Sequence, residues 1–138
     1  MNTTFKTYTP EGFSTLNSYL FTENPEELIQ FLKNSFYAEE INRSINTRNN
    51  SIGNCILKIG DTCFMISQAR GEFMNMRTAF YLYVEDVDSV YENAIRYGAL
   101  NSFEPEDMDY DDRQAGIIDT SGNYWFISKR LLNKGYHE

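Results

Sequence analysis

The chain has 138 residues, of which 41% are apolar and 15% aromatic, and its formal net charge is −8. This length is enough to bury a core without disulfides or metal ions, and no apolar run is long enough to span a membrane. The negative charge argues against a nucleic-acid partner, because phosphate binding needs a basic face, and it favours small cations instead.

The chain begins MNTTFKTYTPEGF, which has neither the basic start nor the apolar stretch of a signal peptide. We therefore expect a cytoplasmic protein. The alternating residues around Tyr19 then predict a strand that leads into a helix, with Asn24 as the N-cap and Pro25 in the first helical position. The apolar stripe of this helix is formed by Leu28, Ile29, Leu32 and Phe36.

Two apolar runs flank the Gly60-Asp61 pair and predict a hairpin with a two-residue turn. In that hairpin Cys63 lies opposite Lys58, while Cys55 lies opposite Ile66. The two cysteines are therefore predicted to be reduced thiols and not disulfide partners.

The second half of the chain repeats the first. The segment YLYVEDVDSVYEN (81–93) aligns with YLFTENPEELIQF (19–31), an offset of 62 residues. It predicts a second strand and helix, with Asp86 as the N-cap and Gly98 as the stop. The apolar stripe of this helix is formed by Val90, Tyr91, Ala94 and Ile95. Farther along, SGNYWFIS (121–128) aligns with GDTCFMIS (60–67) at an offset of 61 residues.

Each half thus reads as a strand, a helix and two or three further strands, which predicts two tandem βαβββ modules of the α+β class. The polar stretches 42–54 and 69–77 are predicted to be loops. The run EPEDMDYDD (104–112) is predicted to be a solvated loop or, alternatively, an acidic mouth that attracts a cation, with Tyr110 available for stacking.

The paired modules, with the phrases YLYVEDVDSVYENAIRYGA and DDRQAGIIDTSGNYWFIS, resemble the glyoxalase, bleomycin-resistance and extradiol-dioxygenase superfamily, also called vicinal oxygen chelate. The ending resembles the D-R-x-A-x-x-x-D-P-F-G-N-x-W-x-I of the PhnB-like branch, although residues 119–123 lack the usual Pro and Phe. The resemblance implies a cupped mixed sheet around a cavity and a homodimer. It also implies one domain over residues 1–138, with modules at about 13–68 and 78–130.

In metal-dependent members of the superfamily, His, Gln or Glu side chains bind the metal at equivalent places in the two modules. The resemblance carries these places onto Asn17, Met65, Ala79 and Phe126. The last three cannot bind a divalent cation, and one Asn supplies only a weak neutral oxygen. His137, the only histidine, lies where the chain is expected to fray. We therefore expect no metal, no other cofactor and no metal-dependent lyase or dioxygenase activity.

Residues two apart in a strand share a face, so the former ligand positions mark the face that looks into the implied cavity. That face is rich in tyrosine, which offers a ligand both apolar area and a hydroxyl. Arg113 is placed at its edge, either to hold an anionic or carbonyl group or, equally, to pair with Asp111, Asp112 or another neighbour. The predicted ligand-binding residues are Asn17, Tyr19, Phe21, Met65, Tyr81, Tyr83, Tyr110, Arg113, Tyr124 and Phe126. The residues expected to pack beneath the helices are Leu16, Leu20, Phe80, Leu82, Val84, Trp125 and Ile127.

These patterns predict a metal-independent protein of the bleomycin-resistance kind, which sequesters an amphipathic or aromatic compound, including a cationic one. The alternative is an isomerase, lyase or dioxygenase-like enzyme with a non-standard active site, whose candidate residues would be Tyr19, Tyr81, Tyr124 and Arg113. That enzyme would need a tyrosine with a lowered pKa, and the sequence offers no cause for one. A third reading is a structural role, in which the rings fill the cavity or a dimer seam.

Overall fold

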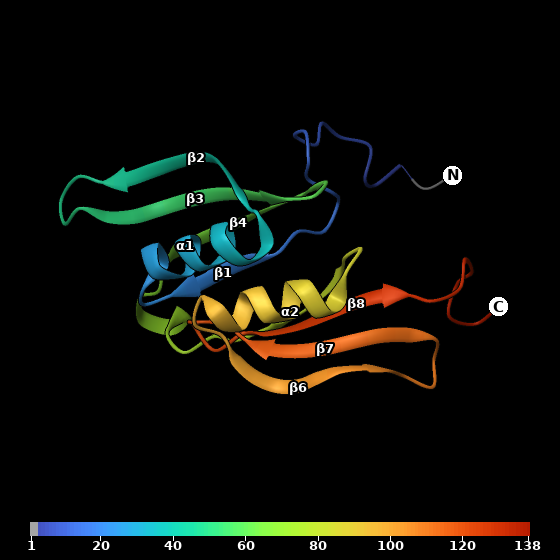
Figure 1. The fold of residues 1–138 in the computed structure, drawn as a ribbon. Coiled ribbons are helices and arrows are strands. Elements are labelled where there is room, and N and C mark those ends of the chain that lie inside the picture. The colour runs from blue at the N-terminus through green and yellow to red at the C-terminus, as the bar shows by residue number, and fades with distance from the viewer. Residues whose placement is uncertain (1–2) are drawn as a thin grey trace. The chain divides into compact units, whose positions relative to one another are not determined.

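The structure is a computed structural model that describes residues 3–138, which form eight strands, two α-helices and one short 3-10 helix (Figure 1). The chain divides into two compact units. Of the described residues, the first contains 3–26 together with 37–76, and the second contains 27–36 together with 77–138. Each unit contains a four-stranded mixed sheet, so the protein is α+β as predicted.

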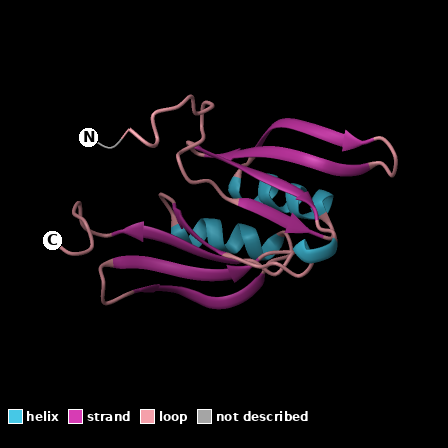
Figure 2. Cartoon of the chain, turned by 180° about the vertical axis from the view of Figure 1, so that it is seen from behind, coloured by secondary structure: helices cyan, strands magenta, loops and turns pink. Residues whose placement is uncertain are grey.

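The first sheet contains β1 (Tyr19–Thr22), β2 (Glu39–Asn46), β3 (Ser51–Ile59) and β4 (Thr62–Gln68). Their order across the sheet is β1-β4-β3-β2, with β1 parallel to β4 and the other neighbours antiparallel. The short helix η1 (Gly71–Phe73) follows β4. Seen from behind in Figure 2, the long β2–β3 hairpin ends in a tight turn.

The second sheet contains β5 (Ala79–Tyr83), β6 (Leu100–Asp107), β7 (Asp112–Ile118) and β8 (Tyr124–Arg130). It has the equivalent order, β5-β8-β7-β6, and the same pattern of directions. The registers also correspond, since Tyr19 lies opposite Met65 in one sheet and Tyr81 lies opposite Phe126 in the other. The predicted pair of βαβββ modules is therefore confirmed.

Both helices begin where the sequence predicts. Helix α1 (Pro25–Phe36) starts with Pro25, and all four residues of its predicted apolar stripe are buried. Helix α2 (Val87–Arg96) is capped by Asp86, whose carboxylate accepts a hydrogen bond from the Ser89 N–H at 3.1 Å. Gly98, with a φ of 110°, follows its last turn and ends it as predicted. No helix within residues 3–138 is long and apolar enough to cross a membrane.

Part of the predicted stripe of α2 is wrong. Ile95 is 37% exposed, whereas Val87 and Ala94 are buried. The helix packs on β6, β7 and β8, and residues seven apart lie on one line of that contact. Because the line through Val87 and Ala94 faces the sheet, Ile95 lies at the edge of the contact between α2 and the strands.

The cysteines lie as the hairpin register predicted. Cys63 is opposite Lys58 and Cys55 is opposite Ile66. Both are buried, and they do not form a disulfide.

Two segments predicted as loops contain strands. Most of 42–54 belongs to the β2–β3 hairpin, and Glu104–Asp107 lies in β6. Backbone pairing to a neighbouring strand stabilises these polar edge strands, and no side-chain pattern reports that pairing in advance. The acidic run is also not uniformly solvated, because Asp112 at its end is completely buried.

The core of the second unit is centred on Trp125. The Phe36 ring of α1 lies 4.8 Å from the Trp125 ring, and the Phe80 ring of β5 lies 4.3 Å from it on a nearly parallel plane. Asn93 of α2 donates a hydrogen bond to the Asn34 carbonyl at 2.9 Å. Trp125 thus lies in the core as predicted, whereas Leu16 does not: it precedes β1 and is 90% exposed.

Candidate functional site

The open face of the second sheet, the face opposite α2, carries aromatic rings, as strand alternation predicts. Tyr81 and Tyr83 of β5 have ring centroids 5.4 Å apart, and the ring of Phe126 on β8 lies 6.0 Å from that of Tyr81, nearly parallel to it. Tyr124 shares the face by its position in β8. Tyr81, Tyr83 and Tyr124 are each about half exposed, so their rings are available to a ligand.

A buried carboxylate lies among these rings. Asp112 Oδ1 accepts from Arg130 Nη1 at 2.9 Å, while Oδ2 accepts from the Tyr81 hydroxyl at 2.7 Å and the Tyr136 hydroxyl at 2.8 Å. These four residues are called the Asp112 cluster below. A buried charge needs such partners, and here three donors supply them. The sequence does not reveal this cluster, because Asp112 stands there as one acid in a run that is predicted to be solvated.

The electrostatics of the Asp112 cluster keep the acid charged and the phenols protonated. Burial alone raises the pKa of the Asp112 carboxyl, but the hydrogen bonds from Tyr81, Arg130 and Tyr136 together outweigh it, so this pKa lies below the ordinary value. Burial, with the bond to Asp112, raises the pKa of Tyr81. At neutral pH the cluster therefore offers an anion and hydrogen-bond donors, and no tyrosine base.

A second series of side-chain hydrogen bonds holds Tyr110 on the same face of the sheet. Its hydroxyl donates to Gln114 Oε1 at 2.5 Å, and Gln114 Nε2 donates to Ser128 Oγ at 2.7 Å. Gln114 and Ser128 are buried, while Tyr110 is 43% exposed. Tyr110 is therefore oriented by a buried amide and keeps part of its ring accessible.

Arg113 lies on the other face of β7, toward α2. Its Nε and Nη2 donate to the Asp88 carboxylate at 2.7 and 2.8 Å, and its Nη1 donates to Asp107 at 3.0 Å. These hydrogen bonds raise the pKa of Arg113 and lower that of Asp88. The sequence left open whether Arg113 holds a ligand group or pairs with an acid. The structure shows it paired with Asp88 and Asp107.

Replacing Arg113 with Gln is expected to leave the affinity for aromatic ligands unchanged, because its guanidinium faces α2 and away from the tyrosine face. Loss of two partly exposed ion pairs should lower the melting temperature only slightly. Titration with an aromatic probe, beside Lys129→Gln as a charge-matched control, checks this. A tenfold loss of affinity confined to Arg113→Gln would show that the residue contacts the ligand after all.

The first unit presents a second aromatic group. The Tyr19, Phe21 and Phe73 rings form a continuous stack, with centroids 4.6 and 4.5 Å apart and planes within 17° of parallel. The Tyr19 hydroxyl is bonded to Ser67 Oγ at 2.8 Å. A pocket of about 450 Å³ lies beside the stack and is also lined by Gln68 and Arg70. Phe73 comes from η1, a segment to which the sequence analysis assigned no function.

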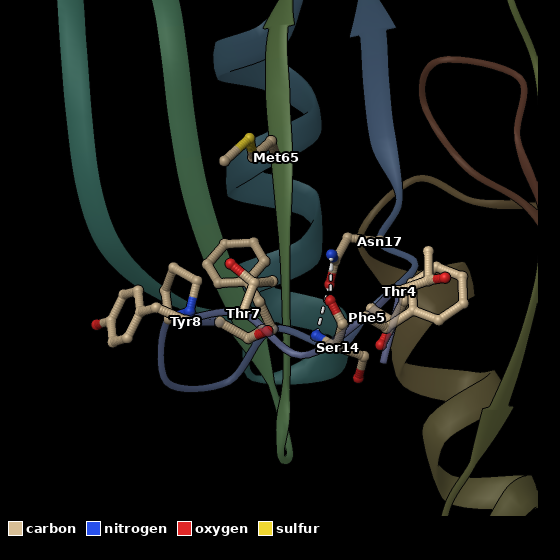
Figure 3. Close-up of a pocket in the computed structure, with 11 residues that line it drawn as sticks. Thr4, Phe5, Thr7, Tyr8, Ser14, Asn17 and Met65 are labelled. Carbon is tan, nitrogen blue, oxygen red and sulfur yellow. Dashed lines mark hydrogen bonds between the residues drawn. The ribbon is translucent and has the colours of Figure 1, made fainter. Parts of the chain in front are cut away.

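Another pocket, of about 410 Å³, brings Asn17 and Met65 together (Figure 3). Residues 4–15 supply the rest of its lining, including Phe5 and Tyr8, which the sequence analysis did not single out. Asn17 Oδ1 accepts from the Ser14 N–H at 2.8 Å, and its Nδ2 donates to the Ser14 carbonyl at 2.6 Å. Both polar atoms of the Asn17 amide thus bind the backbone of Ser14, three residues earlier in the chain.

The residues present do not fit a divalent metal at the places that the superfamily resemblance implies. Met65 and Phe126 lie at equivalent positions opposite Tyr19 and Tyr81, and neither offers an oxygen or nitrogen donor. Asn17 is engaged with Ser14, as described above. Within residues 3–138, no three His, Cys, Asp or Glu side chains are grouped so that they could hold a metal ion.

No protein-family model matches the chain, and no curated protein matches it. Solved structures do match. A glyoxalase/bleomycin resistance protein/dioxygenase family enzyme from Burkholderia phytofirmans PsJN is 18% identical, with a TM-score of 0.66 over 87% of this chain and 98% of that one. The chain has the glyoxalase/bleomycin-resistance/dioxygenase fold.

Two further structures share this vicinal oxygen chelate fold. TioX from Micromonospora sp. ML1 is 18% identical, with a TM-score of 0.72 over 90% of this chain and all of that one. The fosfomycin resistance protein FosX from Listeria monocytogenes, described with Mn(II) and sulfate, is 21% identical, with a TM-score of 0.63 over 85% and 92% of the two chains. Such identities show the fold alone, so the PhnB-like branch stays a prediction.

Proposed function

We propose that the protein binds a small aromatic or amphipathic compound without a metal ion and sequesters it. The observation that carries the proposal is the Tyr19–Phe21–Phe73 stack beside a pocket of about 450 Å³. Phe73 is 41% exposed at the end of the stack, so a planar guest can extend it. The lining also contains polar side chains, among them Gln68, Arg70 and Glu72, and such groups orient a ligand in a site of this kind.

The charge of the chain supports a guest that carries a positive group. The formal net charge is −8, and the open face of the second sheet surrounds an ionised Asp112 with tyrosine rings. Tyrosine faces attract organic cations, and a nearby carboxylate strengthens that attraction.

We also propose a cytoplasmic homodimer, supported by the superfamily resemblance and by exposed Ile41 and Ile45 on the edge strand β2.

The enzyme alternative needs a tyrosine that ionises near neutral pH. Burial raises the pKa of Tyr81 and of Tyr136, which is the opposite of what a general base requires. The Arg113 guanidinium forms ion pairs with Asp88 and Asp107. Binding without catalysis is therefore the function that these residues support best.

Replacing Phe73 with Ala tests the proposal. Wild-type protein is expected to bind planar probes such as acridine orange, and the variant should bind about threefold to tenfold more weakly, because one aromatic stacking contact contributes ~1 kcal/mol. Isothermal titration measures the affinities. Tyr97→Ala, which removes a half-exposed ring at the end of α2, is the matched control.

A thermal-shift series with Mn²⁺, Ni²⁺ and Zn²⁺ accompanies the titration. We expect the aromatic probes, and not the metals, to stabilise the fold. Stabilisation by a divalent metal alone would contradict the proposal, as would equal affinities of the Phe73 and Tyr97 variants.

A further inference from the structure

The segment Leu131–Glu138 returns to the open face of the second sheet. The Tyr136 hydroxyl donates to Asp112 Oδ2 at 2.8 Å and also shares a hydrogen bond with the Tyr83 hydroxyl. Tyr136, the residue before His137, is therefore hydrogen-bonded to the sheet. Two of the groups best suited to hold a ligand on this face, Asp112 and Tyr83, are already in contact with the protein's own side chain.

Arg130 holds the segment in this position. Its Nε donates to the Lys134 carbonyl at 3.1 Å and its Nη2 to the Gly135 carbonyl at 3.3 Å, while Nη1 binds Asp112. The guanidinium carbon also lies 4.2 Å from the centroid of the Tyr136 ring. The segment thus wraps around one cation, and that cation contacts both an aromatic face and a carboxylate.

Few other contacts hold the segment down. It contains no helix or strand, and Leu131, Leu132 and Tyr136 are 45%, 41% and 44% exposed. A segment outside the strand ladder whose large side chains are this exposed opens at lower cost than the buried strands do. Opening also leaves Asp112 hydrogen-bonded to Arg130 and Tyr81, so the buried charge keeps two of its three partners.

We propose that Leu131–Glu138 is a strap that competes with an incoming ligand for the open face of the second sheet. The ligand class is an organic ammonium or guanidinium ion with an apolar body. Its cation takes the Asp112 acceptor released by Tyr136, and its body lies on the Tyr81 and Tyr83 rings. This inference rests on the proposed binding function and adds to it the carboxylate that binds the cation and the element that regulates access.

Tyr136→Phe tests the competition, since it keeps the ring and removes both hydroxyl contacts. Benzylammonium is the probe, and Tyr97→Phe, with a similarly exposed ring, is the matched control. The Tyr136 variant is expected to bind the probe about threefold to tenfold more tightly than wild type, in proportion to the net value of the lost hydrogen bonds. Unchanged or weaker affinity, or no binding to this variant, overturns the strap.

Tryptic cleavage after Lys134, followed by mass spectrometry, reports opening without any ligand. Tyr136→Phe should accelerate this cleavage severalfold, and benzylammonium should accelerate it in wild type. Equal rates of cleavage in the variant and wild type overturn the strap, whatever the binding of the probes.

The failure of the strap can be told apart from the failure of the proposed function. If the strap fails but acridine orange binding still depends on Phe73, the proposed function survives. If Phe73 is irrelevant while benzylammonium opens the segment, the strap stands and the first-unit pocket is excluded.

Discussion

Asp112→Ala is expected to lower the free energy of unfolding by about 3 kcal/mol at pH 7. The side chain is completely buried, and its loss leaves Arg130, Tyr81 and Tyr136 without the acceptor that they share. Removing one partner of a buried charged network costs more than the net value of its bonds, because the remaining groups stay desolvated. Urea denaturation followed by tryptophan fluorescence measures the change.

The same carboxylate predicts how stability depends on pH. The pKa of Asp112 is lower in the folded protein than in the unfolded chain, so its contribution is fully present above the ordinary Asp pKa of about 3.9 and is lost as pH falls through the folded value. The stability difference between wild type and Asp112→Ala should therefore be constant from pH 7 to about pH 5 and shrink below about pH 4.

Two controls accompany this measurement. Asp109→Ala removes an exposed acid of the same run and should change little. Asp112→Asn, which keeps the shape but not the charge, should fall between wild type and Asp112→Ala. A difference that grows on acidification would show that Asp112 is not the ionised acceptor described here.

Trp125→Ala is expected to cost about 4 kcal/mol, the range for truncating a large buried aromatic side chain. Trp125 is 3% exposed, and its ring contacts both Phe36 and Phe80. Its indole N–H also donates to Asp119 Oδ2 at 2.8 Å. Because Phe36 belongs to α1, the substitution should loosen that helix as well as the sheet, which hydrogen exchange of the α1 amides would show.

Trp125→Phe separates the two contributions of this residue. It keeps an aromatic ring in the core but removes the donor to Asp119, so the expected cost is about 1 to 2 kcal/mol. Phe103→Ala, which removes a half-buried ring from the same sheet, is the control for loss of aromatic area. A smaller effect for Trp125→Ala than for Phe103→Ala would contradict the central place given to Trp125.

Several features of the fold follow from local sequence rules. Pro25 and Asp86 start the two helices because one fits the first helical position and the other accepts a backbone N–H. The Gly60-Asp61 turn sets the register that separates the cysteines. Strand parity correctly separates Tyr81 and Phe126 from Trp125 and Ile127, since a period of two depends only on the backbone.

Other features depend on partners far away in the sequence. The polar strands β2 and β6 exist because neighbouring strands pair with them. The sequence also left open whether Arg113 binds a ligand or an acid, because one of its two partners, Asp88, lies 25 residues away in α2.

The sequence alone thus determined the fold class, the repeat, the helix starts and the absence of metal-binding side chains at Met65, Ala79 and Phe126, because these depend on residue type and short-range periodicity. The tertiary structure decided which polar groups meet. Asp112 looks like one acid among six until the chain brings Tyr81, Arg130 and Tyr136 around it, and Phe73 looks like a loop residue until it completes the Tyr19–Phe21 stack. Burial and hydrogen bonding are set by packing between segments distant in sequence, and no local pattern encodes them.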